Sequence, residues 1–324
     1  MAHSVTLLPG DTTGPVLCNA LKDLIEALDV DIAWEEHLLT EGELTESALA
    51  SARSTGTILL GYHHGRRDEG LLPPVVALRR ELEAFANIRP VHLLRGLKSR
   101  FEAVDLVVVR ETTEDIYAHL EHESIPGTFE SLKVTTREAC ERIARYAFDY
   151  AQRTGRGKVT IVHKANIMKQ SDGLFLATAR AVAADYPEIE VEDVIVDALC
   201  MKLIIHPERF DVLVAGNLFG DIVADVCAGI GGGSFNCPSV NVSENGTHLF
   251  AAPHGDRPGF PEAKANPLSV FLPAVLMLRH LGEDAAADRL MTGIEDVLEA
   301  GIHPLAIGGQ ATLADFCMAL RARL

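Results

Sequence analysis

Residues 210–225 read Phe-Asp-Val-Leu-Val-Ala-Gly-Asn-Leu-Phe-Gly-Asp-Ile-Val-Ala-Asp, an apolar strand followed by the start of a helix. Asp221 and Asp225 are four residues apart, so they share one face of the predicted helix. Neighbouring carboxylates repel each other unless water or a cation separates them, and Mg²⁺ and Mn²⁺ prefer carboxylate oxygens. The pair therefore indicates either a solvated acidic face or half of a metal site.

Two more polar residues follow other strand-like runs. Lys164 comes directly after residues 158–163, and Asp197 comes directly after residues 191–196. Functional side chains in α/β sheets gather where the strands end. These positions predict a lysine and a third carboxylate near the metal site.

Strand-like runs alternate with helix-length amphipathic segments along most of the chain. This alternation predicts an α/β fold with βαβ units and a largely parallel sheet. The expected strands are 5–8, 32–35, 56–60, 104–109, 159–162, 195–196 and 212–214, and the expected helices include 16–28, 75–86, 137–153 and 173–186.

Two segments interrupt the alternation. Residues 118–135 form a hairpin-like insertion, which we interpret as an arm that reaches a neighbouring subunit. Residues 229–267 are rich in Gly, Pro, Asn and His, which predicts a loop-dominated region that carries binding residues. The turn at 10–15 has too few glycines for the dinucleotide-binding fingerprint and predicts only a tight turn before a helix.

The composition is that of a globular protein, with 324 residues, 48% hydrophobic residues and a net charge of −17. The negative charge argues against nucleic acid or an anionic membrane as a partner. A small anionic substrate would need local arginines or a metal ion. No secretory segment or bilayer-length apolar run is evident, and six scattered cysteines suit a reducing compartment, so we expect a cytoplasmic protein.

Three arginines are candidates for binding such an anion. Arg79 and Arg89 flank a helix-like segment, and Arg110 closes an apolar strand. Taken alone, each of these arginines is more readily explained as a solvated or ion-paired residue than as a ligand of an anion. A guanidinium group at a strand end, or beside Pro90 in apolar surroundings, suits bidentate binding of a carboxylate.

With these motifs the chain resembles the metal-dependent decarboxylating 3-hydroxyacid dehydrogenases, which include isocitrate, homoisocitrate and 3-isopropylmalate dehydrogenases. The motifs around Lys164 and Arg110 are most similar to those of isocitrate dehydrogenases. The segments that carry the resemblance are 78–90, 109–117, 163–168, 216–225, 254–255 and 265–267.

The resemblance implies a two-lobed fold with a mixed, largely parallel sheet shared by both lobes. Residues 1–94 and 246–324 would form the larger lobe with the nucleotide-binding loops. Residues 95–245 would form the smaller lobe with the dimer interface, the arm and the metal ligands.

The resemblance also implies the reaction, an NAD(P)-dependent oxidative decarboxylation of a 3-substituted malate at its CH–OH group. Lys164 would act as general base at that hydroxyl, and Tyr117 would protonate C3 after CO₂ leaves; without the motif, Tyr117 would be a packed aromatic. Lys164 and Asp197 would come from the other subunit, which implies a homodimer with shared active sites. The substrate clamp implied is Arg79, Arg89 and Arg110, and the ligands for Mg²⁺ or Mn²⁺ are Asp197, Asp221 and Asp225.

The group on C3 of the substrate is read by a segment that departs from isocitrate dehydrogenases. Small polar residues there are replaced by Val75 and its neighbours, as in 3-isopropylmalate dehydrogenases. Upstream, the loop 62–68 carries Arg66, Arg67 and two histidines, and we interpret it as binding an anionic carboxylate or phosphonate substituent. A solvated basic loop is the alternative.

The cofactor loop follows a His-Gly pair and carries neither the acidic marker of NAD enzymes nor the Lys-Tyr pair of NADP enzymes. We favour NAD and leave NADP open. The cofactor-binding residues expected are His254, Gly255, Asp256, Arg257 and Asn266.

Altered recognition loops beside an intact set of acid, base and metal residues indicate an enzyme of a specialised biosynthetic pathway. Activity of the 3-isopropylmalate or homoisocitrate type is the alternative. A non-catalytic regulatory subunit of isocitrate dehydrogenase is a further one, but such subunits lose residues that this chain retains.

Overall fold

The computed structural model describes residues 2–39, 43–63, 72–252 and 259–324. The chain divides into two compact units. Unit 1 comprises residues 1–82, 93–99 and 231–324, and unit 2 comprises residues 83–92 and 100–230. The lobe boundaries expected from the sequence stay a prediction.

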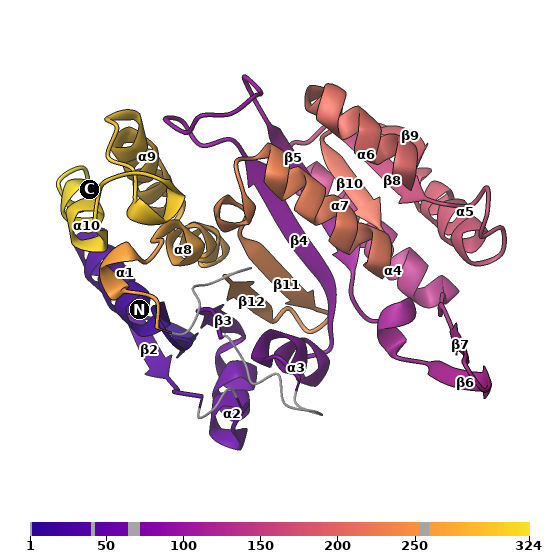
Figure 1. Ribbon diagram of the computed structural model, residues 1–324, viewed down its shortest axis with the longest axis horizontal. Coiled ribbons are helices and arrows are strands. Elements are labelled where there is room, and N and C mark those ends of the chain that lie inside the picture. The colour runs from indigo at the N-terminus through magenta and orange to yellow at the C-terminus, as the bar shows by residue number, and fades with distance from the viewer. Residues whose placement is uncertain (1, 40–42, 64–71, 253–258) are drawn as a thin grey trace. The chain divides into compact units, whose positions relative to one another are not determined.

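Unit 1 is built on a mixed sheet in the order β2-β1-β3-β12-β11, in which only β11 and β12 pair antiparallel among the described strands. The strands are β1 (His3–Leu8), β2 (Ile32–Glu36), β3 (Thr57–Leu60), β11 (Ser239–Ser243) and β12 (His248–Ala251). The helices are α1 (Gly14–Ala27), α2 (Glu46–Thr55), α3 (Pro74–Glu81), α8 (Leu268–His280), α9 (Asp284–Glu299) and α10 (Leu313–Arg321) (Figure 1).

Unit 2 repeats this plan with strands in the order β4-β5-β10-β8-β9, where β4 and β5 pair antiparallel and the others parallel. The strands are β4 (Ala84–His92), β5 (Asp105–Glu111), β8 (Lys158–His163), β9 (Glu190–Ile195) and β10 (Val212–Ala215). The helices are α4 (Arg137–Thr154), α5 (Ser171–Ala183), α6 (Val196–Ile205) and α7 (Asn217–Ile230).

The expected α/β class with a mixed, largely parallel sheet is confirmed. Buried β-branched and aliphatic residues fill β10 and the middle of β5, as strands covered on both faces require. In Figure 1, α7 lies in front of β5 and β10 with α6 beside it. The strand β10 therefore leads directly into α7, which carries both aspartates of the expected metal pair.

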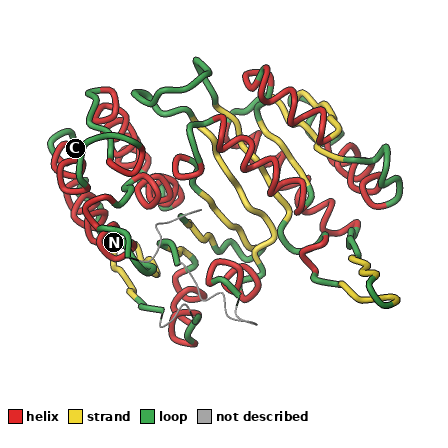
Figure 2. Tube along the Cα trace, viewed as in Figure 1, coloured by secondary structure: helices red, strands yellow, loops and turns green. Residues whose placement is uncertain are grey.

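The expected hairpin is also present. Strands β6 (Glu121–Ile125) and β7 (Thr128–Ser131) form a separate two-stranded sheet, and all of their residues are exposed (Figure 2). An exposed ribbon of this kind has no core of its own.

Two local predictions were wrong, and one region contains more regular structure than expected. The helix expected over 75–86 ends at Glu81, and residue Glu83 has φ 51°, which turns the chain into β4. Pairing of β4 with β5 overrides the helix-favouring residues of this segment. The strand expected at 195–196 ends at Ile195, where α6 begins, and the expected loop region 229–267 contains β11 and β12.

None of the described helices combines the length and the apolar character that crossing a bilayer requires.

Candidate active site

Arg110 lies at the end of β5 and anchors the site in unit 2. Its Nε and Nη2 donate to Asn217 Oδ1 at 3.0 and 2.7 Å, and its Nη1 donates to Asp221 Oδ1. Gly220 makes this approach possible, because a Cβ there would lie 2.6 Å from Arg110 Cγ. The glycine thus lets α7 lie directly against β5 and brings Asp221 to the arginine.

Tyr117 contacts the other carboxylate oxygen of the same aspartate. It lies in a short 3₁₀ turn, Ile116–Ala118, and its hydroxyl donates to Asp221 Oδ2 at 2.5 Å. Burial raises the pKa of this hydroxyl above its ordinary value, and the hydrogen bond and charge of Asp221 raise it further, although Arg110 lowers it. The tyrosine therefore stays protonated at neutral pH, as a proton donor must.

Arg89 approaches the second carboxylate of α7. It is buried on β4, and its Nη2 lies 3.9 Å from Asp225 Oδ1. In the β4–β5 ladder Asn87 pairs with Arg110 and Arg89 pairs with Val108, so both arginines lie on one face of the sheet. Two of the three expected clamp arginines are thus brought together, each beside one aspartate of α7.

Asp221 and Asp225 fit a hard divalent cation. Their side chains are 39% and 63% exposed, and they follow each other by one helical turn on α7. Partly solvated carboxylates at this spacing offer oxygen ligands while leaving room for water and substrate. The donor set therefore suits Mg²⁺ or Mn²⁺.

Lys164 and Asp197 form a second set. Lys164 Nζ lies 2.5 Å from Asp197 Oδ1, and this hydrogen bond lowers the pKa of the Asp197 carboxyl. Asp197 is in the first turn of α6 and its side chain is 68% exposed. Within the described residues no three His, Cys, Asp or Glu gather to hold a metal ion, so one chain presents Asp197 apart from the α7 pair.

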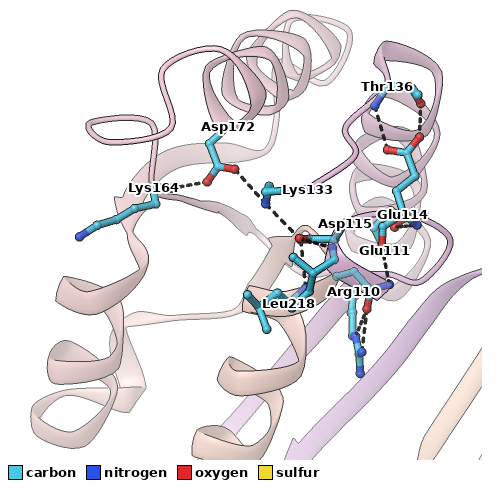
Figure 3. Close-up of polar contacts among 11 residues, drawn as sticks. Arg110, Glu111, Glu114, Asp115, Lys133, Thr136, Lys164, Asp172 and Leu218 are labelled. Atoms are coloured by element: carbon cyan, nitrogen blue, oxygen red, sulfur yellow. Dashed lines mark hydrogen bonds and ion pairs between the residues drawn. The ribbon is translucent and has the colours of Figure 1, made fainter. Parts of the chain in front are cut away.

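Sequence reasoning missed a framework of polar residues that holds both sets in place, shown in Figure 3. Buried Glu111 accepts the N–H groups of Thr113 and Glu114 at 2.8 and 3.0 Å, and burial raises its pKa. Glu114 Oε2 in turn accepts the Thr136 N–H at 2.8 Å, where α4 begins. The other members are Asp115, Lys133, Asp172 and Asn217.

Their signal in the sequence was indirect. Several of these residues lie inside motifs that carry the family resemblance, but their roles depend on long-range contacts. Asn217, for example, joins Arg110 to the Glu114 carbonyl oxygen, to which its Nδ2 donates at 3.0 Å. No local pattern predicts such a contact.

The remaining expected site residues belong to unit 1, and the structure describes only some of them. Arg79 is on α3 and its Nε donates to Asn241 Oδ1 at 2.6 Å. Val75 is partly buried against the core cluster of this unit. Arg66, Arg67, His254, Gly255, Asp256 and Arg257 lie outside the described residues.

Two described residues of unit 1 bear on the predicted recognition loops. Asn266 is buried, its Oδ1 accepts the Leu268 N–H at 3.2 Å, and its Nδ2 has no hydrogen-bond partner among the described residues. That orphaned donor fits an expected contact with the cofactor. His63 is buried, which lowers its pKa, so it is neutral at pH 7 and does not add to the expected cationic loop.

Comparisons with known proteins agree on one class. A family model described as isocitrate/isopropylmalate dehydrogenase matches residues 4–319. The NAD-dependent isocitrate dehydrogenase catalytic subunit 5 of Arabidopsis thaliana mitochondria is 41% identical, over 98% of this chain and 87% of that protein. The corresponding regulatory subunit 1 is 42% identical, over 99% and 90%. The crystal structure of isocitrate dehydrogenase from Methylococcus capsulatus superposes with a TM-score of 0.91 at 38% identity, covering 99% of both chains.

The fold and the site define a decarboxylating dehydrogenase. The chain belongs to the isocitrate/isopropylmalate dehydrogenase family. This membership confirms the expected NAD(P)-dependent enzyme acting on a CH–OH group. Similarity alone does not select the substrate, because the family description names two and the catalytic and regulatory relatives are equally similar to this chain.

Proposed function

We propose that this enzyme oxidatively decarboxylates an isocitrate-like 3-substituted malate to a 2-oxo acid, with NAD and Mg²⁺ or Mn²⁺, in a specialised biosynthetic pathway. The observation that carries the proposal is the cluster of Arg110, Tyr117 and Asp221, with Arg89 beside Asp225. A guanidinium pair, a protonated hydroxyl and two carboxylates are the groups that this chemistry needs.

Substrate binding would exchange ion pairs without creating a buried unpaired charge. In the structure Arg110 pairs with Asp221, and Arg89 pairs with Asp225. A malate would take the two arginines through its carboxylates, and a divalent ion would take the two aspartates. Each half of the exchange releases the groups that the other half uses, so metal and substrate should each strengthen the binding of the other.

The metal would be held by Asp221 and Asp225 of one chain and Asp197 of a second copy. When bound, it lowers the pKa of the substrate hydroxyl and stabilises the negative charge that develops on decarboxylation. Lys164 would remove the proton from the C2 hydroxyl, and Tyr117 would deliver a proton to C3. The raised pKa of Tyr117 suits a group that must be protonated at that moment.

The proposed homodimer is supported by the exposed apolar side chains of unit 2. Met201, Ile204 and Ile205 lie on the face of α6 that also carries Asp197, and Ile222 lies beside Asp221 on α7. The arm adds exposed Ile125 and Phe129. Apolar groups of this number are usual at an interface rather than in water.

A two-fold axis beside α6 and α7 would bring Asp197 and Lys164 of one copy to Asp221 of the other. The partners proposed are therefore a small anionic substrate and a second copy of this chain, and not nucleic acid or a membrane. A cytoplasmic location remains the expectation.

NAD is the proposed cofactor, with NADP as the alternative. The Arabidopsis relatives named above use NAD, and the buried orphan Nδ2 of Asn266 suits a nucleotide contact. We propose that His254, Gly255, Asp256 and Arg257 complete this site.

The substituent on C3 is proposed to be anionic, either carboxylate or phosphonate, and bound by Arg66 and Arg67. Arg79 would complete the malate clamp, and Val75 would contact the substituent. Because Val75 is apolar, an isopropyl-type or homoisocitrate-type substrate is the alternative.

The test is a turnover panel. Purified protein with Mn²⁺ is assayed on malates that carry methyl, isopropyl, carboxyl, carboxymethyl or phosphonomethyl at C3, each with NAD and with NADP. We expect efficient turnover only with an anionic substituent other than that of isocitrate, and a raised KM for it in R66A/R67A. Efficient turnover of plain isocitrate contradicts the specialised role. An unchanged KM in R66A/R67A contradicts the anion assignment.

A further inference from the structure

A buried ion network lies between the two sets of proposed active-site side chains, and Lys133 is at its centre (Figure 3). The Lys133 ammonium is 3.1 Å from Asp115 Oδ2 and 3.1 Å from Asp172 Oδ1. The aspartate side chains are 4% and 5% exposed, and that of the lysine is 17% exposed. Burying two carboxylates this deeply is costly unless a cation compensates their charge, and the Lys133 ammonium lies between them.

One end of the network fixes the turn that carries Tyr117. Asp115 Oδ1 accepts the Ile116 N–H at 2.8 Å, and Asp115 Oδ2 accepts the Leu218 N–H at 3.1 Å, in the first turn of α7. Asp115 has φ 75° and ψ −154°, a conformation that residues other than glycine rarely adopt. Such a conformation persists only where the surrounding contacts stabilise it, and the ion pair of Asp115 with Lys133 is one of these contacts.

The other end fixes the loop that carries Lys164. Asp172, in the first turn of α5, accepts the Lys164 backbone N–H at 2.6 Å through Oδ2, while its Oδ1 contacts Lys133. The side chain of Lys164 then reaches Asp197. One carboxylate therefore holds both the loop after β8 and the Lys133 ammonium.

We propose that Lys133 is a positioning residue, which sets the Tyr117 turn through Asp115 and the Lys164 loop through Asp172. The proposal rests on the proposed function, which gives Tyr117 and Lys164 their roles as acid and base. In the proposed dimer these two groups of one chain serve different active sites, so a single buried cation adjusts both sites at once. Lys133 itself does not contact the substrate.

The first test is Lys133→Met, which keeps the length of the side chain and removes its charge. Lys98→Met, an exposed lysine of unit 1, is the control. Misplacement of both acid–base groups is expected to lower kcat of K133M about 100-fold, while KM changes less than about threefold. The network borders a cavity of about 30 Å³, so a water can enter beside the neutral side chain and the variant can fold.

A role confined to stability would lower the folded fraction and leave kcat per folded dimer unchanged. Each variant is therefore assayed at a known concentration of folded dimer, with the pH profile of kcat. K133R keeps the charge and is expected to restore most of kcat. A kcat of K133M within about threefold of wild type overturns the proposal.

Asp172→Asn supplies a second variant that leaves the charge of Lys133 balanced by Asp115. Its kcat is expected to fall about tenfold, and the double variant K133M/D172N is expected to lose no more than K133M alone, because both act through one contact. Additive losses in the double variant contradict the shared route.

Amide hydrogen exchange separates this proposal from the proposed function. In K133M the N–H groups of Ile116 and Lys164 should exchange faster than in wild type, and in K98M they should not. Unchanged exchange overturns the positioning role, whether or not the wild type is active. Wild-type protein that turns over none of the malates contradicts the proposed function alone.

Discussion

Unit 2 uses aspartate in two opposite ways, and the difference is one of burial and partner. Asp115 and Asp172 are almost fully buried, and each is satisfied by Lys133 and by backbone N–H groups. Asp197, Asp221 and Asp225 have side chains that are between 39% and 68% exposed, and each pairs with the side chain of a lysine or an arginine, which a ligand can replace. The buried aspartates therefore stabilise the fold around the site. The exposed aspartates can exchange their partners for a metal ion or a substrate.

The largest expected effect is on an exposed acid. Asp221→Asn should lower kcat/KM about a thousandfold, because it removes a metal ligand and the partner of Tyr117 and Arg110. Asp288→Asn is the matched control, since Asp288 also pairs with an arginine, at 2.6 Å, but in unit 1. Steady-state rates with Mn²⁺ measure both. Equal activity of the two variants would show that Asp221 has no role beyond that of an ordinary exposed, arginine-paired aspartate.

The next effect is on stability and should be confined to the buried acids. Asp115→Ala leaves Lys133 with one counter-ion and frees the Ile116 and Leu218 N–H groups. We expect the free energy of unfolding to fall by about 3 kcal/mol. Asp197→Ala, on an exposed residue whose partner Lys164 is itself partly exposed, should cost less than about 0.5 kcal/mol. Urea denaturation measures both, and similar losses would break the comparison.

Metal binding should distinguish the two groups without an assay of turnover. Mn²⁺ at about 100 times its Kd should stabilise the wild type by about 2.7 kcal/mol. This stabilisation should vanish in D221N and persist in D172N. A thermal shift that persists in D221N would show that the ion binds elsewhere.

The smallest effect concerns a histidine at the end of α8. Burial lowers the pKa of His280 to about 4, and the neighbouring His248 lowers it too, with the two ring centroids 4.0 Å apart. The unfolded chain takes up this proton as the pH falls through about 6.5, but the folded chain does not until about 4. The free energy of unfolding should therefore decrease as the pH is lowered from about 6.5 to about 4. The decrease should be less steep in His280→Gln. Parallel pH curves of unfolding for both proteins would contradict this.

The sequence was sufficient to predict those parts of the site that lie at the end of a strand or at the start of the segment that follows it. The β10–α7 unit, the strand-end position of Arg110 and the lysine after β8 were all predicted from local pattern, because strand ends and helix starts are local features. The family resemblance implied that Lys164 and Asp197 come from the same subunit, but the hydrogen bond between them was not predicted.

The rest depended on contacts between distant segments. The first residues of β4, Ala84 to Ala86, were predicted as helix because local propensity does not reveal their pairing with β5. Lys133, at the base of the arm, gave no signal that it lies between Asp115 and Asp172. The positive φ of Asp115 is likewise imposed by its surroundings and not by its residue type.

Complementation between two inactive variants tests the shared active site most directly. D221N and K164M, each expected to be inactive, are mixed, unfolded and refolded together. If Lys164 serves the partner's site, each mixed dimer contains one intact site, and activity should recover to about a quarter of wild type. If each active site is formed by one chain alone, every site contains one of the two substitutions, and the mixture should be as inactive as the two variants separately.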